Sequence, residues 1–153
     1  MFQVRKILYP TDFSSYSNQA YFHAVALAET HGASLTVLYV YNGGGDSGRS
    51  PEADKRYWRS QLEQIRPAHA KIPVSHVMLE GDPGVEIARY AADAGIDMIV
   101  MGTHGRTGVE RMLMGSVAEQ TLRAAPCSVL VIKLPKGGSP APKPHVELAA
   151  PVA

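Results

Sequence analysis

The sequence predicts an α/β fold in which an open parallel sheet carries helices on both faces. Short apolar runs alternate along the chain with segments whose apolar residues repeat at helical spacing. The runs are apolar on both faces, which favours buried parallel strands over solvent-facing antiparallel ones. Strands that alternate with helices of this length are typical of βαβ units. We expect one domain over residues 1–134, because 153 residues suit a single domain.

Five apolar runs are the expected strands. They are Val4–Tyr9, Ser34–Tyr41, Val74–Leu79, Asp97–Met101 and Ser128–Ile132. The second run, SLTVLYVY, is rich in the β-branched and aromatic residues that strands favour.

Four helices are expected between these strands, because apolar residues repeat there at three- and four-residue intervals. The apolar faces of the first three comprise Ala20, Ala24, Leu27 and Ala28; Trp58, Leu62 and Ile65; and Ile87, Ala88, Ala91 and Ala92. Gly32, Pro67 and Gly95 are the expected ends of these helices, and Asp82-Pro83 is the expected start of the third. The fourth is expected over about 116–125, before Pro126.

The composition excludes several classes of protein. A formal net charge of +1, with acidic and basic residues interspersed, leaves no basic stripe for nucleic-acid binding. No apolar run is long enough to cross a membrane, and the start of the chain lacks the pattern of a signal peptide. The single cysteine, Cys127, fits a reducing compartment. We therefore expect a cytoplasmic protein with no nucleic-acid or membrane partner.

Two segments fall outside the alternating pattern. Residues 43–50, GGGDSGRS, are predicted to be a flexible polar loop. The tail over residues 135–153 is rich in proline and alanine and has no repeating apolar face, so we expect it to be extended or disordered on its own.

The stretch MGTHGRTGVERMLMGS contains glycines at 102, 105, 108 and 115, between a predicted strand and a predicted helix. In an open parallel sheet, ligands bind beyond the carboxyl ends of the strands, where the strand order reverses. The residues that leave the first and fourth strands, Pro10-Thr11-Asp12 and Gly102 onward, should meet there. Glycines at such a place let backbone N–H groups approach a ligand closely.

The residue types around these glycines suit a nucleotide. Gly115-Ser116 opens a helix, whose free N–H groups and dipole attract anions. His104 and Arg106 could add positive charge, and the acceptor-only carboxylate of Asp12 suits a ribose hydroxyl. The pattern predicts a pocket with a phosphate end and a hydroxyl-binding end.

Simpler interpretations exist for each residue. Ser116 and Glu119 fit a capping box that serves the helix alone, and either Asp12 or Ser14 could cap the helix that follows the first strand. Gly43, Gly45 and Gly48 fit a dinucleotide-binding fingerprint, but Arg49-Ser50-Pro51 separates them from the next helical pattern. The sequence has no P-loop lysine motif and no histidine or cysteine spacing typical of a metal site.

The complete spacing Gly102-x2-Gly105-x9-Gly115-Ser116 resembles the motif of the universal stress protein family, in its ATP-binding branch. Pro10-Thr11-Asp12, Val40 late in the second strand and Pro126-Cys127 before the last strand also match, and the resemblance spans roughly residues 2–133. It implies a five-stranded parallel sheet in the order 3-2-1-4-5, a Rossmann-like fold of the adenine nucleotide alpha hydrolase-like type.

The resemblance also implies a ligand, ATP, with or without Mg²⁺ or Mn²⁺, and a role for each matching residue. Val40 would meet the adenine through its backbone, with Pro10 and Thr11 nearby, and Asp12 and Gly102 would hold the ribose. Gly105, Gly115, Ser116 and the N–H of Val117 would contact phosphates. Met101, His104 and Arg106 complete the candidate set.

For the assembly, the resemblance implies a homodimer formed by pairing of the last strands, Ser128–Ile132. For the function, the first expectation is a stress-response regulator whose bound ATP biases a conformation or the surface for an unidentified protein partner. The alternatives are a slow ATP hydrolase and a module of the same fold that binds partners without nucleotide. We expect binding to be the main function, because no residue is an evident base for positioning water.

Overall fold

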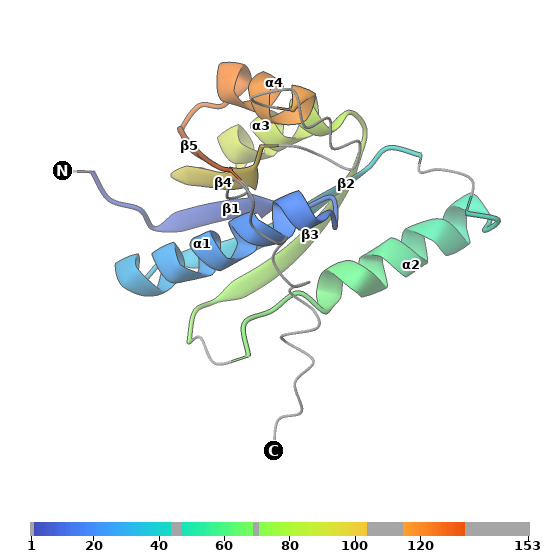
Figure 1. Cartoon of the computed structure of the whole chain (residues 1–153), viewed down its shortest axis with the longest axis horizontal. Coiled ribbons are helices and arrows are strands. Elements are labelled where there is room, and N and C mark those ends of the chain that lie inside the picture. Colours follow the sequence, from blue (N-terminus) through green and yellow to red (C-terminus); the bar gives the residue numbers. More distant parts are fainter. Residues whose placement is uncertain (1, 44–46, 69–70, 104–114, 134–153) are drawn as a thin grey trace.

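The computed structural model describes residues 2–43, 47–68, 71–103 and 115–133. They form a five-stranded parallel sheet in the order β3-β2-β1-β4-β5 (Figure 1), which confirms the predicted class and strand order. The strands are β1 (Lys6–Pro10), β2 (Ser34–Tyr41), β3 (Val74–Glu80), β4 (Met98–Gly102) and β5 (Ser128–Ile132). β2 and β5 have the predicted bounds, and the other strands differ by one or two residues at an end.

The start of β4 illustrates such a difference. Asp97, predicted to be the first residue of the strand, lies just before it. Its carboxylate Oδ2 accepts hydrogen bonds from the N–H groups of Arg5 (2.9 Å) and Lys6 (3.0 Å). The side chain therefore joins the starts of β1 and β4 and fixes their parallel alignment.

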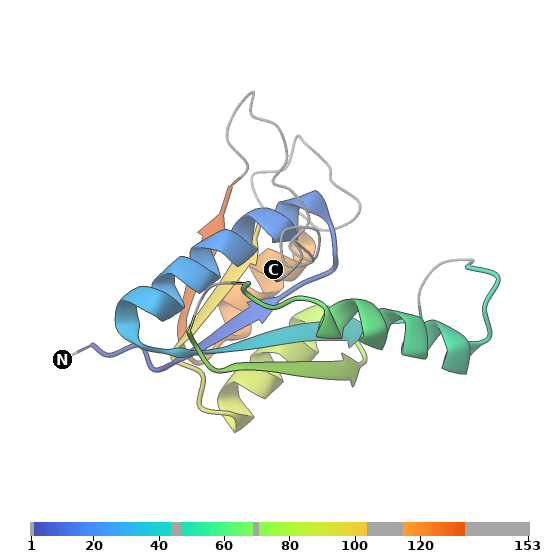
Figure 2. The same cartoon turned by 90° about the horizontal axis from the view of Figure 1, so that it is seen from below.

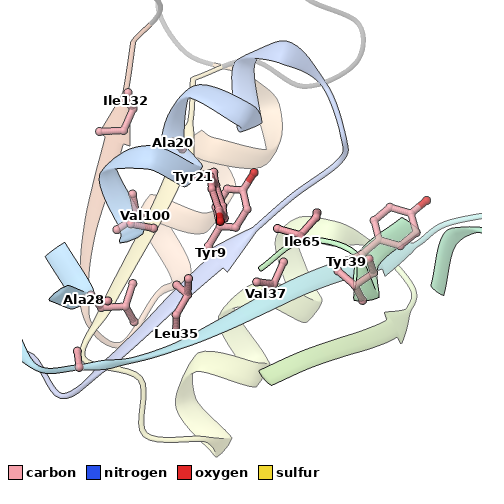
Figure 3. Close-up of a cluster of buried hydrophobic side chains, with 14 of the residues drawn as sticks. Tyr9, Ala20, Tyr21, Ala28, Leu35, Val37, Tyr39, Ile65, Val100 and Ile132 are labelled. Atoms are coloured by element: carbon pink, nitrogen blue, oxygen red, sulfur yellow. The ribbon is translucent and has the colours of Figure 1, made fainter. Parts of the chain in front are cut away.

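Helices cover both faces of the sheet (Figures 1 and 2). They are α1 (Ser15–His31), α2 (Pro51–Glu63), α3 (Pro83–Asp93) and α4 (Ser116–Ala124). α1 and α2 pack on one face through a core cluster that includes Tyr9, Val37 and Ile65 (Figure 3). α3 and α4 pack on the other face through a cluster that includes Leu38 and Ile99. β2 is thus buried on both faces, as its apolar sequence predicts.

The predicted helix signals are largely confirmed. Gly32 adopts the left-handed conformation, with φ of 63°, at the end of α1, and Asp82 caps α3 through its side chain. Two details were wrong. α2 ends at Glu63 and not at Pro67, although Ile65 beyond it is still buried, and Ala92 is exposed instead of lying on the buried face of α3.

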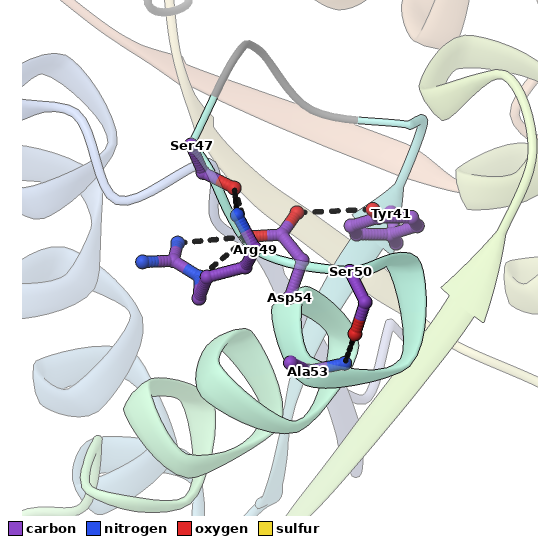
Figure 4. Close-up of polar contacts among 6 residues, drawn as sticks. All are labelled: Tyr41, Ser47, Arg49, Ser50, Ala53 and Asp54. Carbon is purple, nitrogen blue, oxygen red and sulfur yellow. Dashed lines mark hydrogen bonds and ion pairs between the residues drawn. The ribbon is translucent and has the colours of Figure 1, made fainter.

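The segment before α2 was predicted to be a polar, flexible loop, and its described residues 47–50 are a loop that hydrogen bonds tie to the first turn of α2. Buried Asp54 accepts hydrogen bonds from the Tyr41 hydroxyl (2.9 Å), the Ser47 hydroxyl (3.2 Å) and the Arg49 guanidinium (2.8 and 3.0 Å), as Figure 4 shows. Ser50 caps the helix by accepting a hydrogen bond from the N–H of Ala53. These contacts fix the start of α2 at the end of β2, and α2 begins directly after this segment.

Acidification is expected to weaken the Asp54 network. Burial by itself raises the pKa of this carboxyl, but hydrogen bonds from Arg49, Tyr41 and Ser47 outweigh that effect and hold the pKa below its ordinary value of 3.8. Such a group stabilises the fold above its unfolded-state pKa, and the contribution is lost as the pH falls through the folded-state pKa. Below about pH 4, the free energy of unfolding measured with urea should therefore fall more steeply with decreasing pH for the wild type than for Asp54→Asn. Equal pH slopes for the two proteins would contradict this.

Candidate functional site

The carboxyl ends of β1 and β4 leave the sheet at one edge. The two strands pair in parallel, with Ile7 opposite Met98 and Leu8 opposite Ile99. α1, which follows β1, and α4, which follows β4, lie on opposite faces of the sheet. This is the geometry of a switch point, where open α/β sheets bind their ligands. The structure therefore brings together the strand ends that carry the predicted site, Pro10-Thr11-Asp12 and Gly102.

The Asp12 carboxylate is held by the first turn of α1. Its Oδ1 accepts hydrogen bonds from the N–H of Ser14 (2.9 Å) and the hydroxyl of Ser17 (3.1 Å). Ser14, and not Asp12, is the N-cap of the helix, since its side chain accepts a hydrogen bond from the N–H of Ser17. The carboxylate is thus oriented in advance and only partly buried, as a hydroxyl-binding group requires.

Thr11 supports this loop from inside. Its N–H donates to the carbonyl of Leu38 (2.8 Å), and its hydroxyl accepts a hydrogen bond from the N–H of Phe13 (3.0 Å) and lies 3.2 Å from the hydroxyl of Ser17. Thr11 is buried and its side chain is committed within the protein. Its polar groups therefore shape the loop.

Gly102, the last residue of β4, lies against the backbone of α1. A Cβ at this position would be 2.5 Å from the carbonyl oxygen of Tyr16 and 3.2 Å from the backbone nitrogen of Ser17. Close approach of α1 therefore requires glycine here, independently of any ligand. The sequence carries no signal of this close contact, because the contact depends on how Tyr16 and Ser17 in the first turn of α1, 86 and 85 positions earlier in the chain, cross the strand end.

The start of α4 is held beside the end of β4. Thr103 donates its N–H to the carbonyl of Ile132 (3.1 Å) and accepts a hydrogen bond at its own carbonyl from the N–H of Gly115. This pair joins the two ends of the glycine-containing segment, so Gly115-Ser116 lies next to Gly102 in space. His104, Gly105 and Arg106 lie outside the described residues.

The amino end of α4 differs from those of the other described helices. α1, α2 and α3 are capped by the side chains of Ser14, Ser50 and Asp82, but the N-cap of α4 is Gly115, and no side chain of the described residues caps this helix. The capping-box interpretation of Ser116 was wrong, because Ser116 is the first residue of the helix and Glu119 instead pairs with Arg123 at 2.7 Å. The first-turn N–H groups of a helix attract anions when no side chain satisfies them.

Apolar candidates lie beside this polar edge. Val40 and Met101 are buried in the cluster on the α3 and α4 face, and Val117 packs against the same cluster. Val40 is the penultimate residue of β2, opposite Leu79 of β3. The described part of the predicted site thus combines apolar side chains, an oriented carboxylate and an uncapped helix start.

Other kinds of site receive no support within the described part of the chain. No group of three or more His, Cys, Asp or Glu residues there is arranged to hold a metal ion. No described helix is long and apolar enough to cross a membrane. Gly43 and Gly48 of the alternative fingerprint have positive φ, at 92° and 74°, and the following helix is capped by its own Ser50.

The arrangement is that of one known family of α/β proteins. The model of the universal stress protein family matches residues 3–133, and the chain belongs to this family. Universal stress protein MJ0531 of Methanocaldococcus jannaschii is 36% identical over 142 residues, which cover 86% of this chain and 84% of that protein.

Solved structures agree with this assignment. The structure of MJ0577, a second universal stress protein of M. jannaschii, matches with a TM-score of 0.69 and 28% identity, over 88% of this chain and 99% of that one. A universal stress protein of Archaeoglobus fulgidus in complex with dAMP has a TM-score of 0.64 at 21% identity, over 87% of this chain and 100% of its own. The latter likeness shows the fold alone.

Proposed function

We propose that this universal stress protein binds ATP at the carboxyl edge of β1 and β4 and acts in stress response through the conformation or partner surface that the nucleotide stabilises. The observation that carries the proposal is the uncapped start of α4, joined to the end of β4 through Gly115 and Thr103 at the same edge as Asp12. An anion site and a hydroxyl acceptor at one edge match the two polar ends of a nucleotide. The dAMP complex of the A. fulgidus protein supports the proposal, because that protein has the same fold.

Each part of the site has a proposed role. The backbone of Val40 meets the adenine beside Pro10 and Thr11, and Asp12 holds the ribose. The N–H groups of Ser116 and Val117 contact phosphates, because the Gly115 N–H is already bonded to Thr103. Gly105, His104 and Arg106 are proposed to complete the phosphate end, where Mg²⁺ or Mn²⁺ would be held by the phosphates.

Removing the carboxylate of Asp12 is expected to weaken nucleotide binding moderately. Asp12→Ala loses a hydrogen bond worth about 0.5–1.5 kcal/mol, or roughly two- to tenfold in Kd. Calorimetric titration of the two proteins with ATP measures this. Asp12→Asn is the matched control, because its amide oxygen keeps an acceptor at the same place. A Kd for Asp12→Ala equal to that of the wild type would remove Asp12 from the site.

Hydrolysis is proposed to be slow. Transfer of a phosphoryl group to water needs a positioned nucleophile and stabilisation of the developing charge. Asp12 is assigned to the ribose, and no other residue is an evident base for positioning water. Multiple-turnover release of phosphate at about one per second, abolished by Arg106→Ala, would overturn this view.

We also propose that β5 pairs with β5 of a second copy. Within the described chain, β5 pairs only with β4, and Leu130 on it is 37% exposed. An unpaired apolar edge promotes aggregation, and a two-fold dimer would cover it. Sedimentation equilibrium should give twice the chain mass, whereas a monomer at micromolar concentration would contradict the dimer.

A further inference from the structure

Helix α2 is joined to the body of the protein at a few points. Its first turns project beyond the carboxyl ends of β2 and β3 (Figures 1 and 2), and its buried residues are Asp54 and Leu62. Between these two, Trp58 contacts two aromatic rings of the body. Its ring lies 4.9 Å from that of Phe13 in a stacked arrangement, with 26° between the planes, and 5.7 Å from that of Tyr39.

Phe13 is the only described residue other than glycine with a positive φ, at 66°. A bulky side chain rarely adopts this conformation, and it persists only where the surroundings fix it. Two kinds of contact do so here. The Phe13 N–H donates to the hydroxyl of Thr11 at 3.0 Å, and the Phe13 ring packs against both Trp58 and Tyr39, each with its centroid 4.9 Å away.

Phe13 directly follows Asp12, so the strained backbone conformation at Phe13 also sets the direction of the Asp12 carboxylate. Thr11, after β1, and Ser17, in α1, hold this loop through hydrogen bonds. From α2, the only described ring that stacks on the loop is that of Trp58, which contacts Phe13. Loss of the Trp58 ring would let Phe13 relax toward a common conformation and turn Asp12 away from its bonds with Ser14 and Ser17.

We propose that Trp58 is a positioning residue for the nucleotide site, which acts through Phe13 on Asp12. The inference rests on the proposed function and deepens it, because it makes α2 the element that senses the nucleotide. Binding free energies are reciprocal, so a ligand that favours the ordered Asp12 loop also favours the docked position of α2. The projecting start of α2 would then present the bound state of the site to a partner.

The test compares ATP binding by the wild type with three variants in calorimetry. Trp58→Ala should raise the Kd several-fold, and by no more than the roughly two- to tenfold expected of Asp12→Ala, because the strained loop is no longer held. Trp58→Phe should keep the Kd within about twofold of the wild type, because it retains a stacked ring. Leu62→Ala is the matched control, since α2 buries Leu62 in the same core cluster against which the partly buried Trp58 packs. It should lower the urea midpoint at least as much as Trp58→Ala and leave the Kd within about twofold of the wild type.

Trp58 is the only tryptophan of the chain, so its fluorescence reports on this contact directly. Saturating ATP should change the emission of the wild type, and the change should be lost in Asp12→Ala even when that variant is also saturated with ATP. If the wild type binds ATP while its emission stays constant and Trp58→Ala has an unchanged Kd, the positioning role is wrong and the nucleotide site stands. If the wild type binds no ATP, the site and the positioning role both fall.

Discussion

Replacing Gly115 with valine is expected to lower the affinity for ATP by about 100-fold or more while the protein stays folded. Gly115 has φ of −72° and ψ of 162°, an extended conformation that valine adopts without strain. Its N–H, which donates to the carbonyl of Thr103, is retained in the variant. The branched side chain would occupy the space in front of the first turn of α4, where the phosphates are proposed to bind.

Calorimetric titration with ATP measures the loss, and circular dichroism with urea unfolding checks the fold. Gly115→Ala is the graded control, because a single methyl group obstructs less space and should give an intermediate Kd. A Gly115→Val protein that binds ATP as tightly as the wild type would show that the triphosphate lies elsewhere.

Replacing Gly102 with alanine is expected to destabilise the fold by about 1–3 kcal/mol, the usual cost of overpacking. The added Cβ would lie 2.5 Å from the carbonyl oxygen of Tyr16. That oxygen belongs to the backbone of α1, so the helix itself would have to shift. Urea unfolding gives the change in free energy. Because this effect arises without any ligand, a loss of nucleotide binding in a Gly102 variant would not by itself place a ligand at β4.

Gly84→Ala is the matched control for this prediction. A Cβ at Gly84 would also contact a neighbour, but that neighbour is the side chain of Gln120, which is exposed and can rotate. We therefore expect Gly84→Ala to be near neutral. If Gly102→Ala were equally neutral, that result would contradict the inference that α1 approaches β4 too closely for a side chain at this position.

Much of the fold could be predicted from the sequence, because the signals there are local. β2 and β5 are continuous apolar runs, and Gly32 and Asp82-Pro83 are residues that end and begin helices wherever they occur. The start of α2 was missed although it carries a similar signal. Ser50-Pro51 is a good cap and first turn, but the preceding glycines favoured a loop, and the burial of Asp54 among Tyr41, Ser47 and Arg49 depends on tertiary contacts.

The candidate site was predictable to a different extent. Glycine spacing and strand ends predicted that Asp12, Gly102 and Gly115 would lie at one edge, and the structure places them there. The orientation of Asp12 by Ser17, the link from Thr103 to Gly115 and the positive φ of Phe13 left no trace in the sequence. The first two depend on the three-dimensional path of a loop, which the residue types do not specify, and the third is a conformation that the residue type disfavours.

The most direct test of the central claim is made on freshly purified wild-type protein without added ligand. The protein is denatured, any released nucleotide is identified by chromatography and mass spectrometry, and a nucleotide-free sample is titrated calorimetrically with ATP, ADP and AMP. The account predicts an adenine nucleotide in near-stoichiometric amount, or saturable heat with ATP that is lost in Gly115→Val. No released nucleotide and no heat with any of the three would contradict it, and the glycine segment would then serve only to connect β4 to α4.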